Sequence, residues 1–226
     1  MTLLPAILGI FCVQARPADV QEEPAPIWTV SAFFRMTAPN GDAAEGDITY
    51  GDLFKGGVGA SLEGSLTLPS ESMVSLSGYL ALGFDEFRGE RYDDDSGDSL
   101  KPEPLLVWSG LGGAMVRFSF DDLMSEDHQI VADFRLGGGV VCYTSTDADF
   151  TIGGVPHHDR ELFESTVAGA WELGMRTGVV SRSFGFLIGL SYRGAGGPRR
   201  GRDVTSAVDP GTFHEVSFEI GWDYRL

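Results

Sequence analysis

The 226-residue chain predicts an all-β fold, an eight-stranded antiparallel up-and-down transmembrane β-barrel, from three observations. Eight segments alternate large apolar side chains with small, polar or charged ones, and a period of two is typical of a β-strand with two unlike faces. Each segment has about ten residues or more, the length that a tilted strand needs to cross a bilayer. Long and short connections alternate along the chain, as they do in barrels of the bacterial outer membrane.

The last strand, 216–226, shows the alternation most clearly. Its apolar residues are Val216, Phe218, Ile220, Trp222, Tyr224 and Leu226, and between them lie Ser217, Glu219, Gly221, Asp223 and Arg225. This segment alone fits the edge strand of a soluble sandwich as well as a barrel strand that faces lipid, so the other segments decide between the two.

Seven further strands are predicted at 27–36, 56–68, 73–85, 105–120, 130–144, 163–176 and 184–193. In each, bulky apolar residues share one face and charged or small residues share the other; Phe33 interrupts the polar face of the first strand. A soluble barrel would hold its apolar residues inside. Small and charged side chains together suit a narrow polar lumen instead, with aromatic belts at the bilayer interfaces that draw on Trp28, Trp108, Trp171, Trp222, Tyr192 and Tyr224.

The connections give independent support. Long ones are expected at 37–55, 86–104, 145–162 and 194–212, and short ones at 69–72, 121–129 and 177–183. Short turns belong on the periplasmic rim of an outer-membrane barrel and long loops on the extracellular rim. A soluble sandwich has no reason to sort its loops in this way.

Composition narrows the function classes. The formal charge of −17 argues against nucleic acid as a partner, because its phosphates would be repelled. Hydrophobic residues make up 42% of the chain and are nowhere continuous enough for a spanning helix. The two cysteines, Cys12 and Cys142, lie in the leader and on a predicted apolar strand face, so no internal disulfide is expected.

The predicted domains are a signal peptide at 1–15, a periplasmic linker at 16–26 and the barrel at 27–226. The leader ends in Val13-Gln14-Ala15, an acceptable cleavage pattern, but has no Lys or Arg before its apolar run. The true translation start therefore stays open. A lipidated Cys12 is not expected, because Phe11 is too large for the preceding position.

The ending Glu219-x-Gly221-x-x-Tyr224-x-Leu226 resembles the C-terminal assembly signal of bacterial outer-membrane proteins, which most often end in Phe. This resemblance implies that the barrel assembly machinery reads Gly221, Tyr224 and Leu226. As an architecture, 27–226 resembles the small eight-stranded family of OmpA-like transmembrane domains and OmpW-type proteins. It implies a monomer in the bacterial outer membrane, and we expect no periplasmic peptidoglycan-binding domain, since the chain stops at the barrel.

The predicted lumen is rich in charges of both signs, and unpaired burial of a charge is costly. We expect ion pairs across a closed interior, and the alternative is a gated path for ions or small solutes. The residues are Arg35, Glu63, Arg117, Asp133, Arg135, Glu172, Arg176, Arg193, Glu219 and Asp223, with Arg225 beside them.

Two loop clusters have the residue types of metal ligands. The acidic loop 90–98 is expected to be a solvated tip, with calcium binding left open because the spacing fails the EF-hand pattern. His157, His158 and Asp159 lack the further ligands that zinc needs. We predict no metal and no cofactor.

One basic cluster stands out in this acidic chain. Arg199, Arg200 and Arg202 lie in the fourth long loop, at the outer rim. Guanidinium groups there suit the phosphates of lipopolysaccharide and other outer-membrane lipids. Neutralisation by the acidic second loop is the equal alternative.

No catalytic set is recognised. His214 and Ser217 stand near Glu215 and Glu219, but a separation of three places them on opposite faces of a strand. The sequence thus predicts a non-enzymatic protein with a structural or surface-binding role through its long extracellular loops. A narrow channel and a lipid A-modifying barrel enzyme are the alternatives.

Overall fold

The computed structural model describes residues 26–41, 43, 48–68, 70, 72–94, 97–120, 128–202 and 210–226. The predicted signal peptide and residues 16–25 of the predicted linker lie outside this part of the chain. Within it, no helix is both long enough and apolar enough to cross a membrane.

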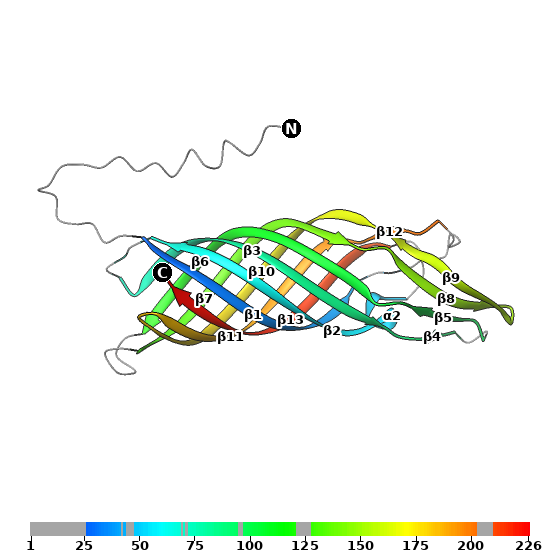
Figure 1. Cartoon of the computed structure of the whole chain (residues 1–226), viewed down its shortest axis with the longest axis horizontal. Coiled ribbons are helices and arrows are strands. Elements are labelled where there is room, and N and C mark those ends of the chain that lie inside the picture. The colour runs from blue at the N-terminus through cyan, green and yellow to red at the C-terminus, as the bar shows by residue number, and fades with distance from the viewer. Residues whose placement is uncertain are drawn as a thin grey trace, which may run out of the picture.

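Eight long antiparallel strands close into a barrel in the order β1-β13-β11-β10-β7-β6-β3-β2 (Figure 1). This confirms the predicted fold class. The strands are β1 (Ile27–Asn40), β2 (Phe54–Thr67), β3 (Val74–Gly89), β6 (Leu105–Phe120), β7 (His128–Tyr143), β10 (Thr166–Ser181), β11 (Phe184–Gly196) and β13 (Thr212–Arg225).

The last strand closes the barrel against the first. β1 and β13 pair from Thr29↔Arg225 to Asn40↔His214, and the Leu226 N–H donates to the Trp28 carbonyl oxygen at 2.9 Å. With both edges paired, every barrel strand has two neighbours, as a bilayer requires of a spanning sheet.

The two faces of the barrel wall lie as the alternation predicts. Leu82 is 72% exposed on the outside, whereas Arg35 is 1% exposed in the lumen. Phe33, which interrupts the polar face of β1 in the sequence, also lies inside, where it is buried. Apolar residues outside and charged residues inside suit hydrocarbon as the surrounding medium, and the chain is therefore a transmembrane barrel.

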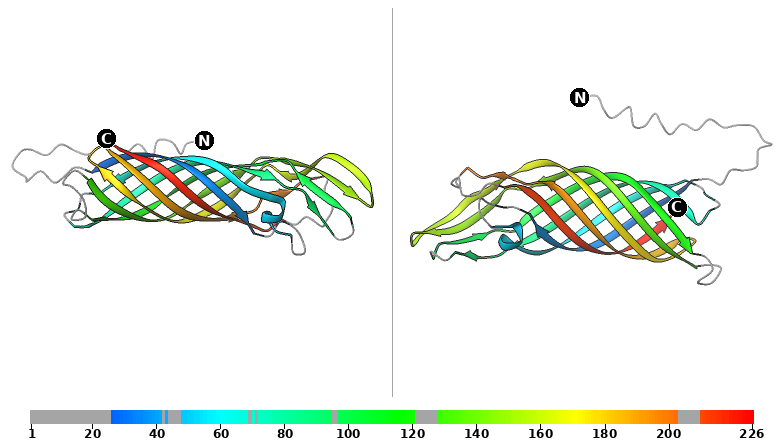
Figure 2. Two further views of the ribbon diagram at one scale, coloured as in Figure 1. Left: turned by 90° about the horizontal axis from the view of Figure 1, so that it is seen from below. Right: turned by 180° about the vertical axis from the view of Figure 1, so that it is seen from behind.

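A second sheet extends the barrel beyond the long-loop rim (Figure 2). Its strand order is β12-β9-β8-β5-β4, formed by β4 (Tyr92–Asp93), β5 (Ser99–Pro102), β8 (Thr146–Ile152), β9 (Val155–Glu164) and β12 (Arg199–Arg200). The expected long loop 145–162 is therefore mostly a β-hairpin. Its turn is Gly153-Gly154, whose φ values of +57° and +78° suit glycine.

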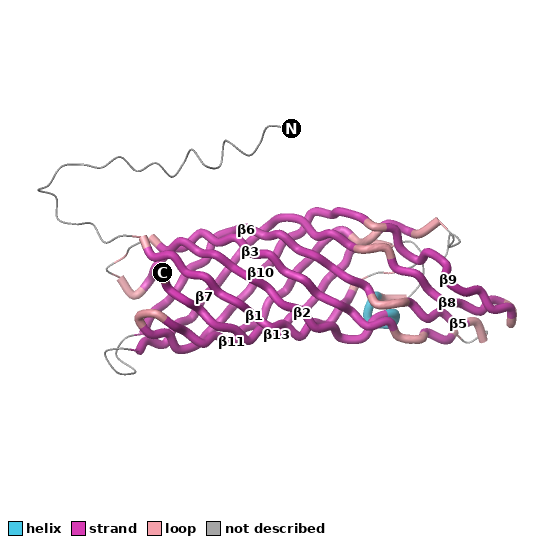
Figure 3. The backbone as a smooth tube through the Cα atoms, viewed as in Figure 1, coloured by secondary structure: helices cyan, strands magenta, loops and turns pink. Residues whose placement is uncertain are grey.

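The two ends of the barrel differ, as the loop lengths predict. β10 and β11 are joined by Arg182 and Ser183 alone, and the start of β1 and the end of β13 lie at this same end (Figure 1). The other end carries the second sheet and the short helix α2 (Tyr50–Leu53). Apart from α2, the wall in Figure 3 is almost entirely strand.

Candidate functional site

The lumen is filled by a buried network of ion pairs, and its layer nearest the short-turn end centres on Arg117. Asp133 is the cross-strand partner of Arg117, and its two carboxylate oxygens accept from Nε and Nη2 of Arg117, each at 2.7 Å. The same Nη2 lies 3.2 Å from Asp223 Oδ2, and the Ser31 hydroxyl also donates to Asp223. A bidentate pair of this kind fixes both side chains.

The middle layer holds two guanidinium groups among three carboxylates. Arg135 lies 2.8 Å from Glu63, 2.7 Å from Glu172 and 3.0 Å from Glu219. Arg176 lies 3.0 Å from Glu63 and 2.9 Å from Glu219.

Two aromatic rings support this middle layer. The guanidinium of Arg176 stands 3.6 Å above the Phe33 ring and that of Arg135 5.7 Å from the Tyr79 ring. Phe33, the exception to the polar face in the sequence, is therefore a cation–π partner within the lumen.

The outer layer contains two acidic residues that the sequence reasoning left out of the lumen. Arg35 lies 3.0 Å from Asp85 and 2.9 Å from Glu215. Arg193 lies 2.8 Å from Glu215, 3.4 Å from Asp85 and 3.2 Å from Glu172. Asp85 ends the predicted strand 73–85 on its polar face, two residues after Gly83. Glu215 precedes Ser217 at the same spacing, just outside the predicted strand 216–226, so the alternation extends to both.

Small residues make room for these large side chains. A Cβ at Gly174 would lie 2.6 Å from Arg135 Nε, and a Cβ at Gly189 would lie 2.6 Å from Arg176 Cγ. Neither position accepts a side chain without displacing part of an arginine.

Acidic residues are more numerous than arginines in this network. Its ion-paired members in the described chain are five arginines, Arg35, Arg117, Arg135, Arg176 and Arg193, and seven acids, Glu63, Asp85, Asp133, Glu172, Glu215, Glu219 and Asp223. Arg225 is half-buried and makes no ion pair with any described residue. Carboxylates therefore outnumber guanidiniums inside the barrel.

An apolar layer lies beyond the charges, toward the second sheet, and sequence reasoning did not anticipate it. Tyr50 and Leu53 of α2 are buried in it. The centroid of the Phe213 ring lies 5.1 Å from that of Tyr50, 5.5 Å from that of Phe87 and 5.6 Å from that of Tyr143. We call this layer the aromatic plug. Its buried members are Ala43, Tyr50, Leu53, Phe54, Phe87, Leu105, Val107, Val141, Tyr143, Ala148, Leu162, Phe163, Ala195 and Phe213.

The basic cluster in the fourth loop lies on the outside of the barrel rim. Arg199 and Arg200 are exposed in β12, where they pair in register with Glu164 and Phe163 of β9. Arg202 lies 3.2 Å from Glu164 of β9. One alternative expected the acidic second loop to neutralise this cluster, but the acid that Arg202 contacts belongs to β9. Arg199 and Arg200 make no ion pair with any described residue.

The two candidate metal loops have other contacts. In the acidic loop 90–98, where residues 95 and 96 lie outside the described chain, Asp98 accepts from the Gly153 N–H at 2.8 Å and so joins the tip of the β8–β9 hairpin. The Asp159 N–H and then the His158 ring hold the pKa of the Asp149 carboxyl below its ordinary value. No group of three or more His, Cys, Asp or Glu residues that could hold a metal occurs in the described chain.

The histidine and serine considered for catalysis do not meet. His214 is on the outer face, where its Nδ1 lies 2.9 Å from the Tyr192 hydroxyl, whereas Ser217 is buried in the lumen and accepts from Arg35. Cys142 is a free, half-buried cysteine on the outer face.

The aromatic residues named for the belts and the assembly-signal residues lie on the faces that the alternation predicts. Trp28, Trp222, Tyr224 and Leu226 are all exposed toward the short-turn end. Gly221 faces inward, where a Cβ would lie 2.2 Å from the Phe33 ring. Packing therefore requires glycine here, and whether the assembly machinery also reads it stays a prediction.

No protein-family model and no curated protein matches the chain. Among solved structures, it is similar to Neisserial surface protein A, at 13% identity over 88% of this chain and 97% of that one, with a TM-score of 0.38. It is also similar to Ail, the attachment invasion locus protein of Yersinia pestis, at 14% identity over 88% and 98%, with a TM-score of 0.38. A third similar structure is the outer membrane enzyme PagL, at 13% identity over 87% and 98%, with a TM-score of 0.41.

Proposed function

We propose that this chain is a non-conducting barrel of the bacterial outer membrane that acts as a surface protein through its second sheet, β12-β9-β8-β5-β4, which we call the extracellular sheet. One observation carries the proposal: the ion-pair network and the aromatic plug follow one another along the lumen, and the described side chains of both are buried. An ion would have to displace both. The chemistry open to a partner is then that of the extracellular sheet and of the rim.

The extracellular sheet offers an exposed polar surface. Lys101 and Asp149 are cross-strand partners on β5 and β8, and Asp149 contacts His158 of β9. All three side chains are exposed. A surface of mixed charge on a hydrogen-bonded sheet suits a polar external ligand better than an apolar one.

At the rim, we propose that Arg199 and Arg200 contact phosphates of outer-leaflet lipid, including lipopolysaccharide. The Arg199 N–H donates to Thr166 Oγ1, and Thr166 directly precedes Val167, which is 66% exposed on the lipid-facing wall. The two guanidinium groups thus stand where the wall leaves the bilayer, without an ion-pair partner in the described chain.

We also propose that the chain is not an enzyme, since His214 and Ser217 lie on opposite sides of the wall. Planar-bilayer recording of the purified full chain tests the closed lumen, and mass spectrometry of lipid A from overproducing cells tests the absence of catalysis. We expect no stepwise conductance and an unchanged lipid A spectrum. Conductance steps would establish the channel alternative, and a new lipid A species would establish the enzyme alternative.

A further inference from the structure

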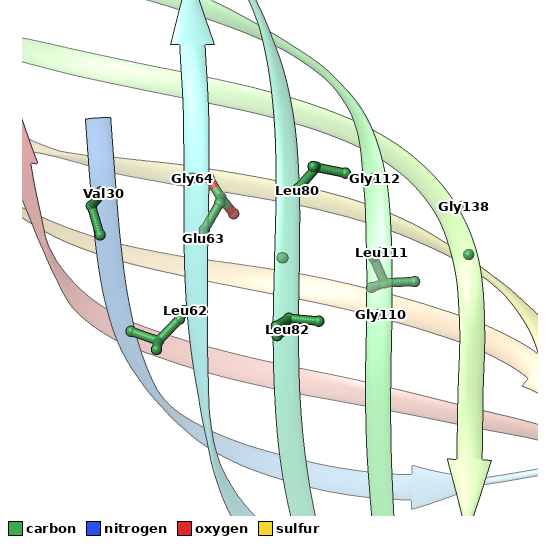
Figure 4. A pocket seen from close by; sticks show the side chains of 12 residues that line it. Val30, Leu62, Glu63, Gly64, Leu80, Leu82, Gly110, Leu111, Gly112 and Gly138 are labelled. Atoms are coloured by element: carbon green, nitrogen blue, oxygen red, sulfur yellow. The ribbon is translucent and has the colours of Figure 1, made fainter. Parts of the chain in front are cut away.

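A broad hollow lies on the lipid-facing wall of β2, β3 and β6. The part nearer the short-turn end has a volume of about 700 Å³ and is bordered by Leu62, Leu80 and Leu82 (Figure 4). A second part of about 720 Å³, bordered by Phe34, Phe84 and Trp108, shares Leu62, Leu82 and Gly110 with the first. The two parts therefore form one continuous apolar groove, which we call the wall groove.

Glycines shape the floor of the wall groove. Leu80 is the cross-strand partner of Gly64 and Gly112, and Leu82 is the partner of Gly110. Leu80, with glycine on both sides, is 74% exposed, and Leu82, with Gly110 on one side and Leu62 on the other, is 72% exposed.

Packing of the barrel does not explain Gly64 or Gly138, both of which border the wall groove. A Cβ at Gly64 would have nothing within 4 Å, and a Cβ at Gly138 would meet only the Ala170 carbonyl oxygen at 3.6 Å. The glycines that make room for the lumen arginines have contacts near 2.6 Å. A glycine within a strand weakens it and often marks a site where a ligand approaches closely.

Cations stand at the outer ends of two strands that form the groove. Lys55 of β2 and Arg88 of β3 are cross-strand partners, and both are exposed. Lys55 pairs with Glu90 at 2.5 Å, and Glu86 is exposed on the same strand. Arg88 makes no ion pair with any described residue, so its guanidinium group is open to an external anion.

We propose that the wall groove binds one acyl chain of a phosphorylated outer-leaflet glycolipid of the lipid A class, with a phosphate of that lipid on Arg88 and Lys55. The long-loop rim places these cations at the outer leaflet. Arg88 lies four positions beyond Phe84 on β3, about 13 Å along the strand. This distance leads from the headgroup region into the apolar groove. This site is separate from Arg199 and Arg200.

The test is native mass spectrometry of the purified full chain with lipid A, and with phosphatidylglycerol as the competing lipid. We expect one retained lipid A for the wild type, loss of that lipid in Gly64→Leu and Gly138→Leu, and about fivefold weaker retention in Arg88→Ala. Gly169→Leu is the matched control, because a Cβ there also has nothing within 4 Å, while Gly169 does not border the groove.

Each other outcome contradicts the proposal. Retention by the two leucine variants at the wild-type level would show that the groove is not the site. Equal retention of phosphatidylglycerol would refute a glycolipid ligand, and a two-barrel species lost in Gly138→Leu would assign the groove to a second copy. A heat-shift gel verifies that each variant is folded. Arg88→Lys should retain more lipid A than Arg88→Ala, because lysine keeps the positive charge.

Discussion

Replacing Arg176 with methionine should strongly destabilise the barrel. The Arg176 side chain is 2% exposed and lies 3.0 Å from Glu63 and 2.9 Å from Glu219, so its removal leaves two buried carboxylates with one cation fewer. Breaking a buried pair in this way costs about 3–5 kcal/mol. Loss of the cation–π contact with Phe33 adds to this cost, whereas Arg135 still neutralises part of the charge. We therefore expect a net loss of about 4 kcal/mol in the free energy of unfolding.

The assay is a urea titration of the folded barrel in lipid vesicles, followed by tryptophan fluorescence at about pH 8. Val167→Leu, on a residue that is 66% exposed to lipid, is the control and should change the free energy of unfolding by less than about 0.5 kcal/mol. If the free energy of unfolding of Arg176→Met lies within about 1 kcal/mol of the wild-type value at pH 8, the reasoning is refuted, since breaking a buried ion pair should cost more than this.

Three further predictions follow from the same structure. Glu172→Gln should cost less than Arg176→Met in the same titration, because carboxylates outnumber guanidiniums in the network, and an equal or larger cost would contradict the acid excess. Leu173→Arg, on the lipid face, should cost about 2–4 kcal/mol near the midplane; if it is tolerated while Val167→Leu disrupts folding, the apolar face does not face lipid. Deleting Leu226 or introducing Tyr224→Asp should lower outer-membrane levels and raise periplasmic degradation on immunoblots of cell fractions, and unchanged levels in both would leave the ending without a special role in assembly.

The strand faces could be predicted from the sequence because one physical rule governs them. On β10, Glu172 is buried and Leu173 is exposed, as a period of two requires. The ion-pair partners could not be predicted in the same way. Arg135 and Glu219 are 84 residues apart, and their contact depends on how the tilt and stagger of all eight strands rotate one side of the lumen against the other.

The lengths of the loops could not predict the extracellular sheet. Long connections predict only that chain leaves the barrel, whereas the pairing of β5 with β8 depends on contacts between separate loops, such as Leu100↔Phe150. A local signal did exist in one place. Gly153-Gly154 between alternating residues is typical of a two-residue hairpin turn, and it could have identified the β8–β9 hairpin.

The aromatic plug could not be predicted from the rule that identifies the barrel. That rule places apolar side chains outside and polar ones inside, and at the level of the plug the two faces are exchanged. On β3, the inward side chains change from Asp85 to Phe87, while the outward ones change from Phe84 to Glu86 and Arg88. On β13, the inward Glu215 is likewise preceded by the inward Phe213. Apolar side chains face out where the wall meets lipid and face in where it meets water, since each medium selects the face that it can solvate. For this reason the strand predicted at 73–85 stops short of the end of β3, and the strand predicted at 216–226 starts after the beginning of β13. The level at which the faces exchange therefore marks the outer boundary of the bilayer on this barrel, between Asp85 and Phe87 on one strand and between Phe213 and Glu215 on another.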